Sequence, residues 1–433
     1  MDARSTIAAT TTPTAGLYHG WLVVAVAFLI AVFSWGLGFY GLGIYLVALR
    51  ERFGWSAADI ATAITVYYIV GAALTFLLVG PAFERYGVRR VVAAGTLAMA
   101  AAVTALPLAT ALWHVHAIFA LMSIGWAAMS GAAVNIIVAP WFDRRRGLAV
   151  SVALNGASAG GLIMAPLLIF LIDRFGFATA LTFASLLMLA VLLPLLLLIM
   201  REKRPDEHDR HDDPRVVPIA AQSAPAAPPW SARKILRDRD FLTISIPFAL
   251  GLTAQVGFLT HQVAFLTPMT GAVTAGWIVS LTTVAAIVGR LGTGLFVDRV
   301  DRRVVSCLNF LLQTVAMATL MSTTVPALLV VGCLLFGLGL GNLTSLPPLI
   351  VQQEFPKRDF ARIASMIVGI NQFAFAFGPV LLGWLQKPDG AYTYALFACL
   401  VMQVLGAVIV LAPVLGRSKG SHQAVCSAGR EPR

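Results

Sequence analysis

The chain of 433 residues is 59% hydrophobic and only 12% charged, with a mean hydropathy of +0.84. Soluble globular proteins average about 45–50% apolar and about 25% charged residues, so this composition excludes that class and indicates an integral membrane protein. A β-barrel is not favoured, because the apolar segments are continuous and lack the alternating pattern of barrel strands.

Twelve apolar runs follow one another along the chain, each close to the roughly 17–25 residues with which a helix crosses a bilayer. They lie at about 20–46, 57–80, 91–109, 114–139, 148–172, 177–200, 241–266, 272–297, 304–323, 325–350, 362–386 and 391–415. The first run is longer than the core of a cleavable signal peptide and no basic region precedes it, so we expect it to be retained as a span.

The net charge of +11 is distributed unevenly across the predicted spans. Of the 31 Lys and Arg residues, four lie in loops after odd-numbered spans, one lies inside a span, and the other 26 lie in the termini or in loops after even-numbered spans. This positive-inside bias predicts an inner-membrane protein with both termini in the cytoplasm. It accounts for the basic charge without a nucleic-acid partner.

Residues 201–240 are dense in charge and then rich in Pro and Ala, so they predict a cytoplasmic linker with six spans on either side. The segment "DEHDRHDD" within it could bind a metal ion, but a solvated charged segment is the simpler interpretation, and we expect neither a metal nor a cofactor. The predicted units are a first six-helix bundle at 20–200, the linker at 201–240, a second bundle at 241–415 and a cytoplasmic tail at 416–433.

The two halves match each other at two separate loops. "GPAFERYGVRR" (80–90) corresponds to "GLFVDRVDRR" (294–303), and "WFDRRRG" (141–147) corresponds to "FPKRDFA" (355–361). Both pairs are offset by the same 214 residues. A shared offset at two positions indicates a duplicated six-helix unit.

The first loop pair resembles the signature loops of the major facilitator superfamily. That resemblance implies an all-α membrane protein with twelve transmembrane helices in two pseudo-symmetric six-helix bundles. The chain departs from the pattern at Glu84, where Asp is usual, and at Asp301, where the echo has Gly. The residues that carry the resemblance, together with a further arginine of the second loop, are Gly80, Glu84, Arg85, Gly87, Arg89, Gly294, Asp298, Arg299 and Arg302.

These loops contain charged side chains that could open and close one side of the transporter. A carboxylate at Glu84 or Asp298 can accept hydrogen bonds from helix N-terminal amides and from nearby arginines, and such contacts can form in one arrangement of the bundles and break in another. We therefore predict a gating role for the signature residues. The alternative is that they are simply basic loops on the cytoplasmic side.

Arg290 interrupts the apolar segment "AAIVGRLGTGLFVDRV" (285–300). It precedes Asp298 by eight residues, about 12 Å of helix, and a guanidinium within the membrane core costs at least about 2.5–3.5 kcal/mol on insertion scales. Every Asp and Glu lies in a loop, a terminus or a span end, so no acid inside a span can neutralise it. We expect Arg290 to bind a substrate anion, the alternative being a structural contact with Asp298 or with helix carbonyls.

Four other polar residues in the spans are candidate substrate contacts. His261 could bind the anion or carry a coupling proton, although a packing role is equally in keeping with a lone membrane histidine. Asn135 and Asn371 must find partners in an apolar setting, either in the substrate or in another helix. Tyr67 and Tyr68 are adjacent and point to different helix faces, and we choose Tyr68 as the one that faces the substrate.

A narrower resemblance links "WFDRRRGLAVSVALNGASAGG" (141–161) and Arg290 in "GRLGTGLFVD" to the monocarboxylate transporter and oxalate/formate antiporter branches. In those branches the span 8 arginine binds a carboxylate, and some bacterial members carry a span 7 histidine like His261. The chain lacks their span 1 lysine, has Ala286 where mammalian-type members have an acid, and has no cation on span 11. A monoanion is therefore a more suitable substrate than a dianion.

We therefore expect a monomeric secondary transporter of small organic monocarboxylates, acting by proton symport or anion exchange. A carrier for another amphipathic molecule and a membrane sensor that binds without transport are the alternatives. An enzyme is not favoured, because the spans hold no paired carboxylates, metal-ligand cluster or nucleophile motif.

Overall fold

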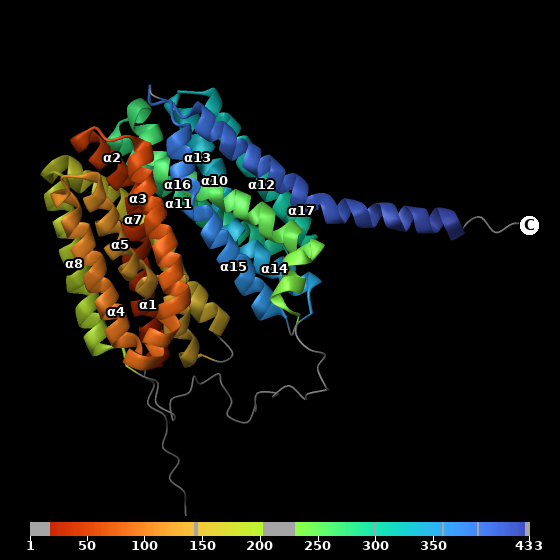
Figure 1. The fold of residues 1–433 in the computed structure, drawn as a ribbon, viewed down its shortest axis with the longest axis horizontal. Coiled ribbons are helices and arrows are strands. Elements are labelled where there is room, and N and C mark those ends of the chain that lie inside the picture. The colour runs from red at the N-terminus through yellow and green to blue at the C-terminus, as the bar shows by residue number, and fades with distance from the viewer. Residues whose placement is uncertain are drawn as a thin grey trace, which may run out of the picture.

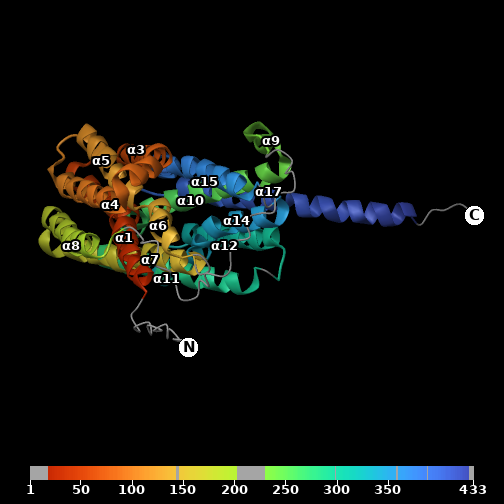
Figure 2. The same ribbon diagram turned by 90° about the horizontal axis from the view of Figure 1, so that it is seen from below.

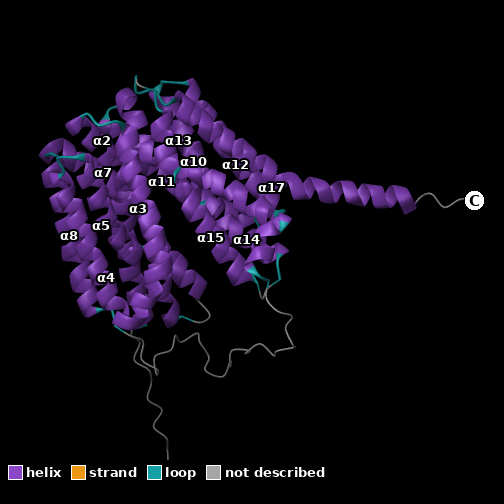
Figure 3. Ribbon diagram, in the orientation of Figure 1, coloured by secondary structure: helices purple, strands orange, loops and turns teal. Residues whose placement is uncertain are grey.

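The computed structural model describes residues 18–142, 146–201, 230–297, 299–356, 359–387 and 389–428. Every regular element within these ranges is a helix (Figure 3). Twelve helical segments are long and apolar enough to cross a membrane, which confirms the predicted number of spans. Their ends differ from the predicted ends by a few residues, and the first span continues to Phe53.

The N-terminal bundle contains the first six spans. Its elements are α1 (His19–Trp35), the π-helical turn η1 (Gly36–Tyr40), α2 (Gly41–Phe53), α3 (Ala57–Leu74), the π-helical turn η2 (Thr75–Val79), α4 (Gly80–Ala105), η3 (Leu106–Leu108), α5 (Leu112–Met129), α6 (Gly131–Val138), η4 (Ala139–Trp141), α7 (Arg146–Phe175) and α8 (Phe177–Leu198).

The C-terminal bundle contains the other six spans. Its elements are α9 (Ala232–Arg237), α10 (Arg239–Thr270), α11 (Ala272–Phe296), α12 (Arg302–Ser322), α13 (Pro326–Leu340), α14 (Asn342–Glu354), α15 (Phe360–Ala376), α16 (Gly378–Leu385) and α17 (Thr393–Ala428). The tenth span is broken at Gly341 and the eleventh at Gly378 and Pro379, where a kink is expected from the sequence. The last turns of α17 extend beyond the bundle (Figure 2).

Two faces of the molecule are named here by the helix ends that they contain. The linker face contains the end of α8 at Leu198 and the start of α10 at Arg239, and the far face contains the end of α2 at Phe53 and the start of α3 at Ala57. The two bundles lie close together near the far face, and their ribbons diverge toward the linker face (Figure 1).

Close contacts between the bundles involve small residues in the far-face half of the spans. A Cβ added at Gly43 on α2 would lie 2.6 Å from the Thr260 carbonyl oxygen on α10, and one added at Gly383 on α16 would lie 2.8 Å from Ala58 Cα on α3. The Ser280 hydroxyl on α11 also donates a hydrogen bond to the Leu162 carbonyl on α7, at 2.9 Å. Glycine at these positions lets the backbones approach closely enough to hold the far face together.

Candidate functional site

Arg290 lies on α11, eighteen residues after the helix begins at Ala272 and six before it ends at Phe296. At 1.5 Å per residue its Cα is about 27 Å from the first residue and about 9 Å from the last, so it is nearer the linker face than the middle of the span. Helical side chains tilt toward the helix N-terminus, which carries the guanidinium back toward the far face.

The guanidinium of Arg290 packs against the break between α13 and α14. A Cβ added at Gly341 would lie 2.7 Å from Arg290 Nε and 2.9 Å from its Nη2, so a side chain at this position would require the guanidinium to move. The side chain is partly exposed, its Nε is buried, and Nε has no hydrogen-bond partner among the described residues. Because Asp298 lies outside the described residues, the structure does not test the alternative contact with it. The arrangement leaves a fixed cation with an unused donor.

No hydrogen bond or ring contact joins the other candidate substrate contacts to Arg290 in the described part of the chain. Asn135 on α6 is exposed, and its Nδ2 donates to the Gly131 carbonyl at 2.8 Å. Asn371 on α15 is 5% exposed, and its Oδ1 has no partner in the described part of the chain. Tyr68 on α3 is 2% exposed, with its ring centroid 5.5 Å from that of Phe375 on α15, so it faces the other bundle. A substrate role for each stays a prediction.

His261 lies in the far-face half of α10 and is fully buried. Its Nε2 is 2.9 Å from the Pro379 carbonyl oxygen, and its Nδ1 is 2.9 Å from the Tyr392 hydroxyl. A carbonyl can only accept, so Nε2 carries the proton in the neutral ring, and Nδ1 accepts from Tyr392. The imidazole thus joins α10 to α16 and to the segment before α17, and its role in substrate binding or proton coupling stays a prediction.

Tyr392 borders a cavity of about 760 Å³ at the far face, where Arg50 and Glu51 of α2 meet Asp389 and other residues of the C-terminal bundle. Burial raises the pKa of the Tyr392 hydroxyl, although the charge of the nearby Arg50 opposes this. Tyr392 therefore stays protonated and can donate to His261. Charged groups of both bundles therefore line one cavity at the far face.

The first signature loop is exposed at the linker face. Glu84, Arg85 and Arg89 are all exposed, and no hydrogen bond or ion pair joins Glu84 to another described residue. The loop starts at Gly80, the first residue of α4. Gly87 has φ of 77°, a backbone conformation that side-chain-bearing residues rarely adopt, so the turn requires glycine.

The second signature loop is arranged differently. Asp301 caps α12 by accepting from the backbone N–H of Arg303 at 2.8 Å, and Arg302 donates to the Leu349 carbonyl. Gly294 and Arg299 are exposed, and Asp298 lies outside the described residues. Gating by either loop stays a prediction.

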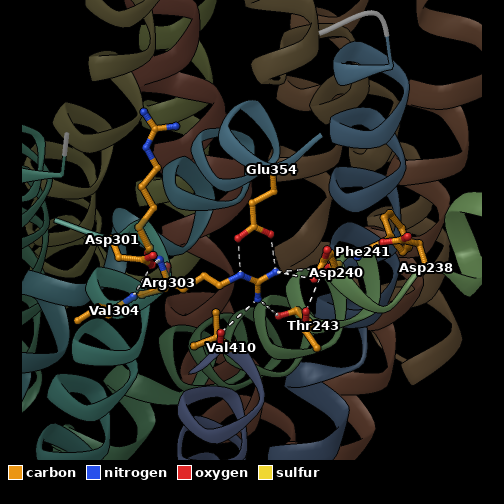
Figure 4. A network of polar contacts seen from close by, with 11 residues as sticks. Asp238, Asp240, Phe241, Thr243, Asp301, Arg303, Val304, Glu354 and Val410 are labelled. Atoms are coloured by element: carbon orange, nitrogen blue, oxygen red, sulfur yellow. Dashed lines mark hydrogen bonds and ion pairs between the residues drawn. The ribbon is translucent and has the colours of Figure 1, made fainter. Parts of the chain in front are cut away.

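A buried ion pair follows the second loop and was not predicted from the sequence. The side chain of Arg303 is 1% exposed, and its Nε and Nη2 donate to the two carboxylate oxygens of Glu354, each at 2.7 Å (Figure 4). Its Nη1 donates to the carbonyls of Thr243 and Val410, and its Nη2 to that of Asp240. One guanidinium therefore joins α10, α12, α14 and α17.

Buried amides form a second feature that sequence reasoning missed. Gln255 Nε2 and Asn309 Nδ2 both approach the Gly339 carbonyl, at 3.4 and 3.3 Å, and Asn342 Nδ2 donates to Asn309 Oδ1 at 3.0 Å. Gln403 Nε2 donates to Gln313 Oε1 at 2.9 Å. These amides come from α10, α12, α14 and α17, and Asn342 directly follows the glycine that packs against Arg290. The sequence feature that could have predicted these residues is an amide side chain inside an apolar span.

Comparison with known proteins agrees with this architecture. The Major Facilitator Superfamily profile matches residues 25–273 and 263–425. An uncharacterized MFS-type transporter of Bacillus subtilis, YcxA, is 23% identical, with 93% of this chain and 97% of that protein covered. Mouse monocarboxylate transporter 11 is 37% identical over 37% of this chain and 36% of that protein, and human monocarboxylate transporter 7 is 22% identical over 90% and 85%.

Two solved structures share the fold. The crystal structure of the nucleoside transporter NupG has a TM-score of 0.68 at 16% identity and covers 92% of this chain and 98% of its own. A bacterial homolog of the human lysosomal transporter Spinster, in an inward-facing and unoccupied conformation, has a TM-score of 0.67 at 14% identity, covering 91% and 96%. At these identities the likeness concerns the fold alone. With the profile match over both halves, the chain belongs to the Major Facilitator Superfamily and is an integral membrane transporter of that superfamily.

Proposed function

We propose that this protein moves small organic monocarboxylates across the inner membrane as a secondary transporter, with Arg290 binding the carboxylate. One observation carries the proposal: a partly exposed arginine on α11 has a buried Nε without a hydrogen-bond partner in the described chain. A donor left unpaired in this way costs about 1–3 kcal/mol or more when charged, which a bound anion would recover.

A carboxylate suits this group better than other small anions. Guanidinium and carboxylate are planar and can form two parallel hydrogen bonds, whereas a neutral solute would leave the charge uncompensated. The spans present the substrate with one cation, Arg290, because the apolar stretches of the other spans carry no Lys or Arg. The similarity to proteins named monocarboxylate transporters 7 and 11 supports the same substrate class.

Alternating access would proceed by rocking of the two bundles about the substrate. The glycine contacts that join the bundles lie in the far-face half, and Glu84 at the linker face is exposed, which supports a conformation open toward the linker face. The Lys and Arg distribution supports a cytoplasmic position for that face and for both termini. In the opposite conformation the signature loops, Asp298 included, would close the cytoplasmic side.

The coupling is proposed to be proton symport or anion exchange by a monomer. Tyr68 and Asn371 are proposed to face the substrate from the two bundles, and Asn135 to contact it during the transport cycle. His261 is the candidate proton carrier. Protonating its Nδ1 would require the Tyr392 hydroxyl to turn from donor to acceptor. Protonation of His261 would therefore change the hydrogen bonding of Tyr392 at the far face.

Counterflow in proteoliposomes tests the proposal. Vesicles loaded with unlabelled lactate or acetate should accumulate the labelled acid with the wild-type protein, and Arg290→Gln should abolish this, while Arg290→Lys should retain a small part because it keeps the charge without the bidentate geometry. Arg174→Gln, an exposed arginine at the far face, is the matched control. Equal counterflow by wild type and Arg290→Gln would disprove the assignment. Binding without counterflow would instead indicate a sensor.

A further inference from the structure

The π-helical turn η1 places two aromatic rings between the bundles. A single π-helical turn inserted in an α-helix is frequently found at functional sites. Here it contains Phe39 and Tyr40, both partly exposed, with ring centroids 5.3 Å apart. The Tyr67 hydroxyl on α3 donates to the Gly38 carbonyl at 2.7 Å. This hydrogen bond fixes the turn against α3 and so fixes the direction of the two rings.

Further rings from three helices join these two. Phe39 stacks on Trp126 of α5, with centroids 6.3 Å apart and an interplanar angle of 18°, and lies edge-on to Tyr68 of α3 at 6.3 Å. Tyr68 in turn meets Phe375 of α15, edge to face at 5.5 Å. Phe39, Tyr40, Tyr68, Trp126 and Phe375 are called the ring cluster here. Four of its members belong to the N-terminal bundle and one to the C-terminal bundle, so the cluster spans the boundary between the bundles.

The ring cluster lies on the far-face side of Arg290. Thr283 precedes Arg290 by seven residues, two helical turns, so both occupy the same face of α11 with about 10 Å between them. A Cβ added at Gly161 would lie 2.5 Å from Tyr40 Cζ and 2.8 Å from Thr283 Oγ1, so Tyr40 lies beside Thr283. Tyr40 is also within electrostatic reach of Arg290. A molecule bound to the guanidinium would therefore extend toward the rings.

The chemistry of the two ends differs. The guanidinium favours an anion, while the rings offer apolar faces and edges whose polar groups are the Tyr40 and Tyr68 hydroxyls and the Trp126 indole N–H. A small hydrophilic acid such as lactate would satisfy Arg290 and leave the exposed parts of Phe39, Tyr40 and Phe375 uncovered. An aryl group would stack on them, and ring pairs add about 0.5–1.5 kcal/mol beyond the burial of their area.

We infer that the substrate is a monocarboxylate with an aromatic body, an arylacetate or arylpropionate, held by Arg290 at its carboxylate and by the ring cluster at its ring. This inference rests on the proposed function. It adds a selectivity that the arginine alone does not give. The single cation restricts the charge to one, and the distance of two helical turns between Arg290 and Thr283 sets the length of the body.

The test compares an aryl series with an alkyl series on the intact, purified protein in lipid nanodiscs. Acetate, lactate, phenylacetate and 3-phenylpropionate are titrated by thermal shift, and each competes for counterflow in proteoliposomes. The aryl acids should act at concentrations roughly tenfold or more below acetate. Phe39→Leu and Phe375→Leu should each reduce the aryl-to-acetate ratio by about three- to tenfold, because one ring contact is lost while the apolar volume is nearly kept.

The controls separate selectivity from folding. Phe183→Leu removes a ring that is 49% exposed on α8 and should leave the ratio unchanged, and Phe375→Tyr keeps a ring and should retain it. The thermal midpoint without ligand shows whether each variant folds. Equal weakening of acetate and aryl acids, or a preference for acetate in the wild type, would overturn the inference and leave the proposed function standing. If no carboxylate stabilises the wild type, the proposed function itself fails.

Discussion

The two bundles share a fold but differ in what they bury. In the described part of α1 to α8 the buried polar side chains, tyrosines and tryptophans apart, are all serine or threonine. The described part of α10 to α17 buries glutamine, asparagine, histidine, aspartate and arginine as well. Hydroxyls can return a hydrogen bond to their own helix, as Thr96 does to the Val92 carbonyl at 2.8 Å. The buried Gln255, Gln403 and Arg303 instead bind groups on other helices.

This difference teaches which polar groups the fold requires. A duplicated six-helix unit forms in the N-terminal bundle with hydroxyls alone, so the amides and charges in the C-terminal bundle are not needed to make the fold. Burying them costs free energy unless they are paired. This contrast supports the proposal that the C-terminal bundle holds the group that binds substrate, with the N-terminal bundle supplying an apolar and aromatic surface.

The equivalent loops make the same point at a single position. Arg89 and Arg303 are separated by the repeat offset of 214 residues. Arg89 is exposed, whereas Arg303 is 1% exposed and binds both oxygens of Glu354. The same residue type in the same loop of the repeat therefore has two different environments.

The largest predicted effect breaks that buried pair. Glu354→Leu leaves the Arg303 charge buried without its carboxylate, which is expected to cost about 3–5 kcal/mol of unfolding free energy. Arg89→Leu, the equivalent position in the other bundle, should change it by less than about 0.5 kcal/mol. Thermal and denaturant unfolding in detergent measure both. The double variant Arg303→Met with Glu354→Leu should recover much of the loss, and similar losses for the two loops would contradict the comparison.

The next effect concerns the buried amides. Gln313→Leu leaves Gln403 Nε2 without its acceptor, and the unpaired amide is expected to cost about 1–3 kcal/mol. Replacing both glutamines by leucine removes the unpaired group and should cost less than the single change. Thermal and denaturant unfolding of the single and double variants measures whether the double change costs less free energy than the single change. A double variant that loses the sum of the two single losses would show that the amides do not act as a pair.

Much of the fold could be predicted from the sequence because membrane insertion depends on local apolar length. The twelve spans and the duplication followed from run length and loop spacing, and the predicted kink at Gly378 and Pro379 matches the break between α15 and α16. Span ends were less accurate, since an apolar window does not show where a helix continues into a loop. The π-helical turn at Gly36–Tyr40 has no periodic signature in an all-apolar run.

The site was harder to predict because it depends on tertiary contacts. Arg290 was found from composition, since a cation inside an apolar run is visible without a structure. Arg303 and Glu354 lie at span ends, where charges are ordinary, so their pairing could not be predicted from the sequence. Asn135 is an intramembrane amide and so a candidate from the sequence, yet it is exposed and bonded to its own helix, while amides on four other helices are buried. Amide composition alone does not tell which side of a helix is buried.

A third prediction concerns the contact between the tenth span and Arg290. Gly341→Ala would place a Cβ 2.7 Å from Arg290 Nε, so the guanidinium must move. Carboxylate affinity is expected to fall about tenfold, roughly 1.4 kcal/mol, with the fold retained. Titration of phenylacetate and acetate by thermal shift measures it. Gly292→Ala on α11 is the matched control, because nothing lies within 4 Å of a Cβ there. Equal affinity in both variants would show that Arg290 is not positioned by the tenth span.

The smallest effect tests the far-face hydrogen bond of the C-terminal bundle. Tyr392→Phe keeps the ring but removes the donor to His261 Nδ1, so the buried imidazole loses one of its two partners. The expected loss is about 0.5–1.5 kcal/mol of unfolding free energy, because the nitrogen becomes an unpaired acceptor. Tyr394→Phe, two residues along, removes a hydroxyl from a side chain that is 57% exposed and should change nothing. This hydrogen bond joins α10 to the segment before α17. A loss of stability confined to Tyr392→Phe would therefore show that polar bonds between helices stabilise the C-terminal bundle at the far face, in addition to the Arg303 and amide networks. No difference between the two variants would limit the contrast between the bundles to the Arg303 and amide networks.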